Sequence, residues 1–299
     1  MTMSERHWPR ASVWLAGESA NPDVVVVGVP SSRASLVASR ADLAPLEVRQ
    51  RLDRFSTFHG ELGVDLSEVA IRDLGNWPVS ELDMASMVDE VADLAAALPR
   101  VDLALFLGGD NAITRPLVAA QSEDLARVGL ITFDAHHDVR DLENGPTNGA
   151  PVRGLIEEHE LPGGNVVQIG IHSFANSAPY RAYCDEAGIT TVTIDQVERI
   201  GMRTAVDVAL SQLSATCDRI YVDVDVDVLD RAFAPACPGS RPGGLTVRQL
   251  SMGVARCAAH PAVTAMDFVE VDPTADRDGQ TLDVMAHLLL TAAAGYATR

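Results

Sequence analysis

Short apolar runs alternate with amphipathic stretches along the chain, and this alternation constrains the fold more than any other feature of the sequence. The apolar runs have the length of buried strands, and the stretches between them have the period of helices. The runs cover residues 24–29, 103–107, 129–133, 166–171, 190–194, 219–224 and 262–269, and the helical stretches lie near 44–54, 85–98, 113–121, 178–187, 203–214, 246–258 and 281–297. Repeated strand–helix units imply right-handed crossovers, so the sequence predicts an α/β fold with a mostly parallel sheet covered on both faces.

The expected elements form one continuous series. A chain of 299 residues is long enough for one large α/β domain or two small ones. Because no internal repeat, low-complexity tract or long linker interrupts the series, we expect a single domain spanning residues 1–299.

The charged residues exclude several classes of function. The 42 acidic residues outnumber the 23 basic residues and give a formal charge of -19, which argues against a surface that binds nucleic acid. All 23 of these basic residues are arginine, and the sequence contains no lysine. The absence of Lys excludes a pyridoxal phosphate Schiff base, lysine-dependent aldol chemistry and a Walker A loop.

The cysteines and the N-terminal segment indicate where the protein resides. Cys184, Cys217, Cys237 and Cys257 have neither the spacing of a zinc knuckle nor that of a disulfide framework. The N-terminal residues contain no continuous apolar core of signal-peptide length, and no run of 18 apolar residues occurs. We therefore expect a cytoplasmic protein that does not associate with a membrane.

Polar side chains follow four of the expected strands at the point where each strand ends. The four segments are GGDN at 108–111, DAHHD at 134–138, DVDVD at 223–227 and EVD at 270–272. In open parallel sheets the loops at the carboxyl ends of the strands converge on the functional site. We expect these acids, carboxamides and histidines to meet at one point.

The alternation within two of these segments predicts a metal site. Every second side chain of an extended segment lies on the same face, so Asp134, His136 and Asp138 share one face, and the acids of DVDVD do the same. Carboxylates that converge so closely repel one another unless cations neutralise them. An oxygen-rich set with one imidazole suits Mn²⁺ better than zinc, and several carboxylates favour two bridged ions.

Two simpler explanations of these acids stay open. An Asp at the end of a strand often caps a helix or begins a turn. Arginine side chains could pair with some of the acids. Unpaired charges in an apolar strand would destabilise the fold strongly, which favours metal binding over either explanation.

The polar segments resemble those of the ureohydrolase family, which includes arginase, agmatinase, guanidinobutyrase and formimidoylglutamase. The resemblance covers nearly the whole chain, with three ligand motifs in the same order. The matching segments are GVP at 28–30, APLEVR at 44–49, GGDN, FDAHHD, VDVDVDVLD, FAPACPGSRPGGLT at 233–246 and DFVEVDP at 267–273. The resemblance implies a three-layer α/β/α fold, two manganese ions and a homo-oligomer, often a trimer or hexamer.

The resemblance also assigns metal ligands. It implies that Asp134 and Asp225 bridge the two ions, that Asp138 binds the first ion, and that His136 and Asp227 bind the second. Asn111 departs from the pattern, because most members have a histidine ligand to the first ion at this position. A carboxamide oxygen binds such a cation more weakly than an imidazole does, so we expect a weakened first site.

The expected reaction is hydrolysis of a linear amidine at a carbon–nitrogen bond. Two ions can lower the pKa of a water that attacks the amidine carbon. Asp138 is the expected acid–base catalyst, which passes a proton to the leaving nitrogen. The resemblance assigns Glu270 to dock the positively charged amidine, although Glu270 could instead be a structural ion-pair partner.

The segment 139–158 distinguishes between branches of the family. Arginases and agmatinases typically have a histidine at the position of Asn148, whereas the segment here is similar to the NG-x-P-x-R pattern of formimidoylglutamases. The segment IGIHSFANSAPYRAY at 169–183 is similar to the same branch. We therefore predict hydrolysis of N-formimidoyl-L-glutamate to L-glutamate and formamide, a step in histidine degradation.

A dicarboxylate substrate requires positive groups in its pocket. We expect Arg140, Arg153 and His172 to bind it, and Asn148 to position it. Arg153 could instead pair with a helix or with a neighbouring subunit, and His172 could be a capped neutral histidine.

Two rival functions stay open. One is a guanidino hydrolase of the same family, acting on agmatine, guanidinobutyrate or arginine, whose pocket would be more acidic. The other is a catalytically silent relative that serves as an oligomeric scaffold, because Asn111 and Asn148 replace residues that are often histidine. The five remaining ligand positions argue against the silent relative.

Overall fold

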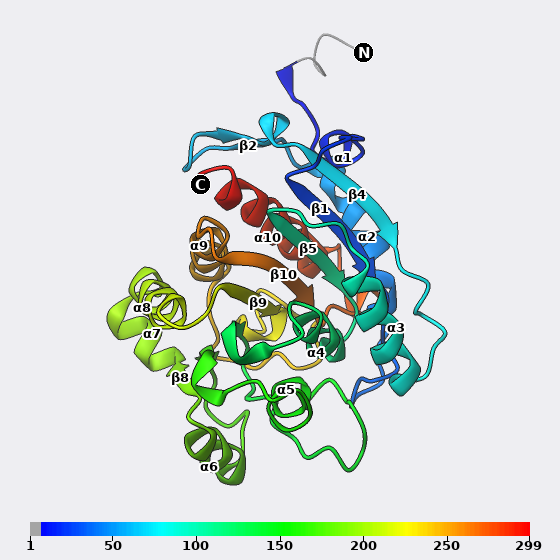
Figure 1. Cartoon of the computed structure of the whole chain (residues 1–299). Coiled ribbons are helices and arrows are strands. Elements are labelled where there is room, and N and C mark those ends of the chain that lie inside the picture. Colours follow the sequence, from blue (N-terminus) through cyan, green and yellow to red (C-terminus); the bar gives the residue numbers. More distant parts are fainter. Residues whose placement is uncertain (1–6) are drawn as a thin grey trace.

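The computed structural model describes residues 7–299 and is organised around an eight-stranded sheet (Figure 1). The strand order is β4-β1-β5-β10-β9-β6-β7-β8, and every neighbouring pair is parallel. The strands are β1 (Val24–Val29), β4 (Ile71–Asn76), β5 (Leu103–Gly108), β6 (Val128–Phe133), β7 (Val166–Ile171), β8 (Thr190–Thr193), β9 (Arg219–Asp225) and β10 (Val263–Val269). This arrangement confirms the predicted α/β class and the parallel sheet.

Helices cover both faces of the sheet and complete the predicted three layers (Figure 1). One apolar core joins the sheet to α1 (Ala11–Leu15), α2 (Ala44–Arg51), α7 (Ile194–Ile200), α8 (Met202–Ser214), α9 (Val247–Ala258) and α10 (Gln280–Tyr296). A second core joins it to α3 (Met84–Ala96), α4 (Thr114–Ala119), α5 (Pro151–His159) and α6 (Ala178–Ala187). Among residues 7–299, no helix combines the length and apolar character that a membrane span requires.

Alternation within the central strands explains why the runs are continuously apolar. In β5, Leu105 and Leu107 contribute to the first core, while Phe106 contributes to the second. In β1, Val26 and Val27 likewise belong to opposite cores. Both faces of these inner strands are buried, which favours apolar residues at most of their positions.

The sequence-based expectation missed four elements of the sheet and its covering layer. Strand β4 lies at the edge of the sheet and is only partly buried, so its segment IRDLGN lacks the continuous apolar run of an inner strand. Helices α1, α5 and α7 are short, with five to nine residues each. A separate two-stranded sheet pairs β2 (Phe58–His59) with β3 (Val64–Asp65).

The sheet order places the polar segments together. Strands β5, β10, β9 and β6 are consecutive neighbours, and the GGDN, EVD, DVDVD and DAHHD segments continue from their carboxyl ends. Because all four strands are parallel, these segments emerge at the same edge of the sheet.

Candidate metal and active site

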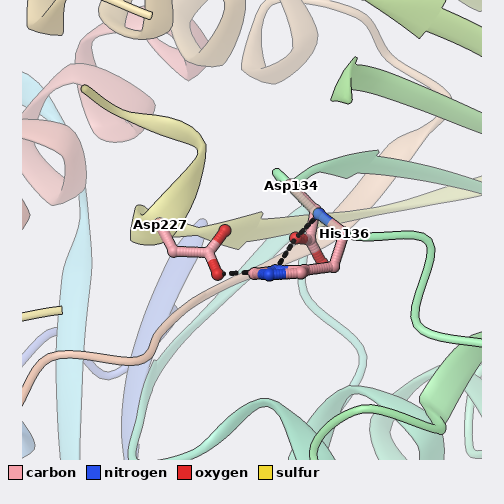
Figure 2. A group of neighbouring side chains, drawn as sticks. All are labelled: Asp134, His136 and Asp227. Atoms are coloured by element: carbon pink, nitrogen blue, oxygen red, sulfur yellow. Dashed lines mark hydrogen bonds and ion pairs between the residues drawn. The ribbon is translucent and has the colours of Figure 1, made fainter. Parts of the chain in front are cut away.

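Three of the predicted metal ligands form a compact group at this edge. Asp134 directly follows β6, His136 lies two residues further on, and Asp227 lies in the short 3-10 turn after β9. The His136 Nδ1 atom is 2.8 Å from an Asp227 oxygen and 3.4 Å from an Asp134 oxygen (Figure 2). One ligand atom from each residue lies within 4.8 Å of the other two, so the group could hold one metal ion.

Asp225 and Asp138 line the cavity that Asp227 and His136 also line. Asp225 ends β9, and one of its oxygens accepts a hydrogen bond of 2.8 Å from the Asp227 backbone N–H. Asp138 has a left-handed backbone with φ of 53°, which costs a non-glycine residue energy and is typical of functional sites. The structure therefore brings five predicted ligands, Asp134, His136, Asp138, Asp225 and Asp227, into one region.

Burial dominates the electrostatics of these acids. It raises the pKa of Asp134 to about 6, with Asp227 adding to the effect, and it raises the pKa of Asp138 and Asp225 well above the usual range. Burial alone would lower the pKa of His136, but Asp227 and Asp134 outweigh burial and raise it to about 12. Burial acts to raise the pKa of Asp227 as well, and the adjacent imidazolium reverses this shift.

The structure distinguishes between the simpler explanations of the acids. Asp134 accepts from the His136 backbone N–H at 2.6 Å, and Asp225 caps the following turn, so both acids do stabilise local turns. Each uses one oxygen in this way. Within residues 7–299, no arginine forms an ion pair with any of the four predicted carboxylate ligands. Pairing with arginine therefore does not account for the cluster.

The donor chemistry fits divalent cations. Buried carboxylates with raised pKa values are poorly solvated anions, and a cation would compensate for the lost solvation. Carboxylate oxygens with one imidazole suit manganese or a similar hard ion.

Asn111 contacts this cluster through its carboxamide. Its Nδ2 atom donates to Asp138 at 2.6 Å, and its Oδ1 atom accepts from the Thr114 hydroxyl at 2.7 Å. The carboxamide oxygen, which would be the metal ligand, is therefore engaged by Thr114. The Nδ2 atom, not this oxygen, faces Asp138, so coordination by Asn111 stays a prediction.

Glu270 lies beside the cluster and is held by two donors. It follows β10 with a left-handed φ of 70°. One of its oxygens accepts from the Asn111 backbone N–H at 2.7 Å and from Asn148 Nδ2 at 2.9 Å. Burial and the nearby Asp110 raise the pKa of Glu270 to about 8, against the opposing effect of these two hydrogen bonds. Asn148 also accepts from the Leu36 backbone N–H at 3.0 Å, so it links two loops of the site.

A cavity of about 160 Å³ opens onto these groups. Its acidic and imidazole members are His136, Asp138, Asp225, Asp227 and Glu270. Asn148 and Arg140, two of the four residues predicted to bind or position the substrate, also line it, and that role stays a prediction.

Arg153 and His172 lie outside the lining of this cavity. Arg153 pairs with Glu157 at 2.9 Å one helical turn away and stacks on the Tyr183 ring at 4.6 Å from its centroid. His172 is buried, its Nε2 atom lies 2.9 Å from the Val228 carbonyl oxygen, and burial lowers its pKa. These contacts agree with the alternatives given for the two residues, an arginine that pairs with a helix and a capped neutral histidine, better than with substrate binding. Substrate binding by either residue stays a prediction.

The sequence analysis assigned no individual role to three residues that shape the cavity. Asn176 lines the cavity and fixes the DAHHD segment, because it accepts from the His137 backbone and donates to the Ala135 carbonyl. Asp110 accepts from Ser31, Ser35 and the Ala34 backbone, which fastens the 30–37 loop. Arg241 lines the cavity from the PGSRPGG segment. All three lie in segments that the sequence analysis singled out, but no spacing predicts their contacts, so only the fold reveals these roles.

Comparison with known proteins agrees with this geometry. A model of the arginase family matches residues 22–295. The chain belongs to the arginase family. The family relation confirms the predicted fold and the predicted class of hydrolase for amidino carbon–nitrogen bonds.

Individual relatives of the arginase family cover most of the chain. The formimidoylglutamase of Halalkalibacterium halodurans is 38% identical over 269 residues, which span 89% of this chain and 84% of that protein. The guanidinopropionase of Pseudomonas aeruginosa is 31% identical over 89% of this chain and 84% of that protein. The crystal structure of formimidoylglutamase from Bacillus subtilis superposes with a TM-score of 0.92 at 33% identity, covering 99% of this chain and 94% of that one.

Proposed function

We propose that the protein hydrolyses N-formimidoyl-L-glutamate to L-glutamate and formamide, and that it requires manganese. The observation that carries the proposal is the cluster of carboxylates and one imidazole, which opens into a small cavity that is also lined by two arginines. Similarity to formimidoylglutamases at 33–38% identity supports this substrate over a guanidino compound. Histidine degradation is the process that this reaction would serve.

Two manganese ions would be held by the buried cluster. Asp134 and Asp225 would bridge them, Asp138 and Asn111 would bind the first, and His136 and Asp227 would bind the second. Such a pair of ions supplies Lewis-acid activation of the hydrolytic water. The weak donor at Asn111 supports a first site of lower affinity.

Asp138 is proposed as the residue that moves the proton. Its carboxylate lines the cavity and is fixed at 2.6 Å by the Asn111 carboxamide. Burial raises the pKa of Asp138, which suits a group that accepts a proton from the attacking water and delivers it to the departing nitrogen of glutamate.

Glu270 is proposed to bind the amidine. One of its oxygens is occupied by Asn111 and Asn148, and its other oxygen has no hydrogen-bonding partner among the described residues. A planar N–C–N group matches a carboxylate in geometry and charge. Asn148 would then hold Glu270 in place while its remaining Nδ2 hydrogen faces the substrate.

The acidic part of the substrate would lie toward Arg140. This side chain is exposed at the edge of the cavity and stacks on the Tyr180 ring at 5.9 Å from its centroid. A cationic substrate such as agmatine would extend its charged tail toward the same guanidinium. Repulsion between the two positive charges would disfavour binding of such a substrate.

The remaining proposals concern the molecule as a whole. We propose that residues 1–299 form one catalytic domain, that the protein acts in the cytoplasm, and that it assembles as a trimer or hexamer. Its partner is a small amidine, with no role for nucleic acid or membrane.

Parallel assays test the proposed reaction. Manganese-loaded protein is incubated with formimidoylglutamate, arginine, agmatine and guanidinobutyrate, and formamide or urea is measured. We expect kcat/KM for formimidoylglutamate to exceed the others by roughly 100-fold or more. Greater turnover of a guanidino compound would assign the protein to that branch, and no turnover of any substrate by metal-loaded protein would favour the silent scaffold.

A further inference from the structure

We infer that Arg241 is a specificity-determining residue that binds one carboxylate of the substrate, beside Arg140. This inference rests on the proposed function and deepens it, because it says how an amidine that carries two carboxylates is recognised. It begins from the distribution of charge in the cavity.

The charged groups of the cavity are separated by depth. The carboxylates of Asp225, Asp227 and Glu270 are buried, whereas the side chains of Arg140 and Arg241 are exposed at the edge. The cavity therefore has an anionic interior and a cationic entrance. A ligand that matches both parts has a positive head and a negatively charged body, as a formimidoyl amino acid does.

Neither guanidinium is neutralised by the protein. Within residues 7–299, Arg140 and Arg241 form no ion pair, although acids outnumber basic residues by 42 to 23 in the sequence. Arg153, by contrast, is paired with Glu157 and is outside the cavity. The two cavity arginines are therefore free to bind anions.

The loop that carries Arg241 is fixed close to the candidate metal ligands. A Cβ atom at Gly239 would lie 2.0 Å from an Asp227 oxygen, so the backbone passes directly against Asp227. Asp230 accepts from the Gly243 backbone N–H at 2.6 Å, and the Arg231 backbone N–H donates to the Arg241 carbonyl at 3.0 Å. These bonds secure both sides of the turn.

The Arg241 side chain is itself partly ordered. Its Nη1 atom donates to the Gly239 carbonyl at 2.9 Å and to the Ser240 carbonyl at 3.3 Å. The Nη2 and Nε donors have no partner among the described residues and can bind a carboxylate. A guanidinium that is already ordered before the ligand binds loses less conformational entropy on binding than a mobile side chain does.

Arg140 provides the second cationic group from the loop after β6, the neighbour of β9 in the sheet. Its aliphatic part packs against Gly149, where a Cβ atom would lie 2.6 Å from Arg140 Cδ. Two separate guanidinium groups match the α- and γ-carboxylates of a glutamyl group, and each can form charge-assisted hydrogen bonds.

Kinetics with three substrates test the inference. Wild type, R241A and R241K are assayed with N-formimidoyl-L-glutamate, N-formimidoyl-L-glutamine, which lacks the γ-charge, and 4-(formimidoylamino)butanoate, which lacks the α-carboxylate. The control is R203A, because Arg203 is also exposed and unpaired in the described chain but lies on α8, away from the cavity. Melting temperature and metal content establish that each variant is intact.

R241A should raise KM for formimidoylglutamate about 10- to 100-fold with little change in kcat. It should also abolish the preference of the enzyme for formimidoylglutamate over one of the two analogues, which identifies the carboxylate that Arg241 binds. R241K should recover part of the loss through its charge, and R203A should match wild type. An intact R241A that retains both preferences overturns the inference while leaving the proposed reaction standing.

Binding of the product separates the inference from the proposed function. Calorimetry should show that R241A binds L-glutamate about 10- to 100-fold more weakly than wild type or R203A does. If wild type binds glutamate through Arg241 but does not hydrolyse formimidoylglutamate, the proposed reaction fails alone. Equal glutamate affinity in R241A and wild type, or no measurable affinity in wild type, overturns the inference.

Discussion

At the scale of single residues, the site depends on a few carboxylates whose contacts differ although their spacing in the chain is regular. Asp223 and Asp225 are two residues apart and share one face of β9. Asp225 lines the cavity, whereas Asp223 lies behind it, fully buried and without a hydrogen-bonding partner for its Oδ1 atom within residues 7–299. Sequence spacing alone does not distinguish these roles.

If Asp225 bridges two manganese ions as proposed, Asp225→Ala should abolish activity and reduce bound manganese from about two ions to one or fewer, because a bridging carboxylate neutralises two charges. Asp223→Ala is the matched control, since it removes the neighbouring acid of the same strand face. We expect Asp223→Ala to retain both ions. Metal analysis after gel filtration checks the pair, and equal metal loss in both variants would contradict the assignment.

Asn111→His should tighten the first metal site, because imidazole is a stronger donor than the carboxamide oxygen. We expect an affinity increase of roughly 10-fold or more, measured by titration of metal-free protein. The change also removes the contact between Asn111 and Thr114, so Thr114→Val serves as a control for that contact. Unchanged stoichiometry and affinity in Asn111→His would mean that residue 111 does not coordinate the ion.

Asn148→Ala should raise KM about 10-fold and lower kcat less, because it removes a hydrogen bond that holds Glu270 and one that holds the Leu36 backbone. Asn148→Asp is an informative comparison, since it keeps the acceptor for Leu36 but places a negative charge beside Glu270. We expect Asn148→Asp to be worse than Asn148→Ala. A large loss of kcat with unchanged KM in Asn148→Ala would instead indicate a direct chemical role.

At the scale of elements, the loops after β6, β9 and β10 carry the residues that form the candidate site at one edge of the sheet. Their tight turns require particular residues. Gly239 brings its backbone against the Asp227 carboxylate, closer than any side chain would permit. The loop after β9 therefore serves the cluster twice, because it carries Asp227 and because its later part, around Gly239, packs against that carboxylate.

Gly239→Ala should lower manganese affinity about 10- to 100-fold, because the added methyl group would lie 2.0 Å from Asp227 Oδ2 and displace that carboxylate. Gly164→Ala is the matched control, since a Cβ atom there meets nothing within 4 Å and its φ is not positive. Metal titration and melting temperature compare the two variants. Wild-type affinity in Gly239→Ala would show that the loop adapts without moving Asp227.

At the scale of the whole molecule, the buried acids connect metal binding to stability. The pKa of Asp134 rises from 3.8 to about 6, that of Glu270 from 4.5 to about 8, and that of His136 from 6.5 to about 12. Each raised pKa means that the folded protein binds more protons than the unfolded chain between the two values. Stability therefore falls as the pH rises through these windows.

The metal-free protein should accordingly melt at a lower temperature at pH 8 than at pH 5. Manganese should reverse this trend, because cations stabilise the ionised carboxylates and metal ligands bind best when deprotonated. The stabilisation by manganese should be several degrees larger at pH 8 than at pH 5, on the order of 1 kcal/mol or more. Calorimetry with and without metal at both pH values checks this. A metal-free melting temperature that rises from pH 5 to pH 8 would contradict it.

The class of fold and the positions of the acidic segments could be predicted from the amino-acid sequence. Inner strands are buried on both faces, so their apolar runs are visible without any structure, and the polar residues that interrupt them stand out. The edge strand β4 and the short helices were missed because they are partly exposed or too short to show a period.

Which of the polar residues lie together could not be predicted, because it depends on contacts between distant parts of the chain. Contacts between Asn148 and Glu270 join residues 122 positions apart, and no local pattern encodes them. The same is true of Arg241, which reaches the cavity because strand order places its loop beside the end of β6. Arg140 and Arg153 lie in the same loop-and-helix segment, and the sequence does not distinguish between them. In the structure, Arg153 lies on α5 and pairs with Glu157, whereas Arg140 lies in the preceding loop and lines the cavity. Charge and composition are properties of the sequence, whereas the pairing or isolation of a charge depends on its neighbours in space.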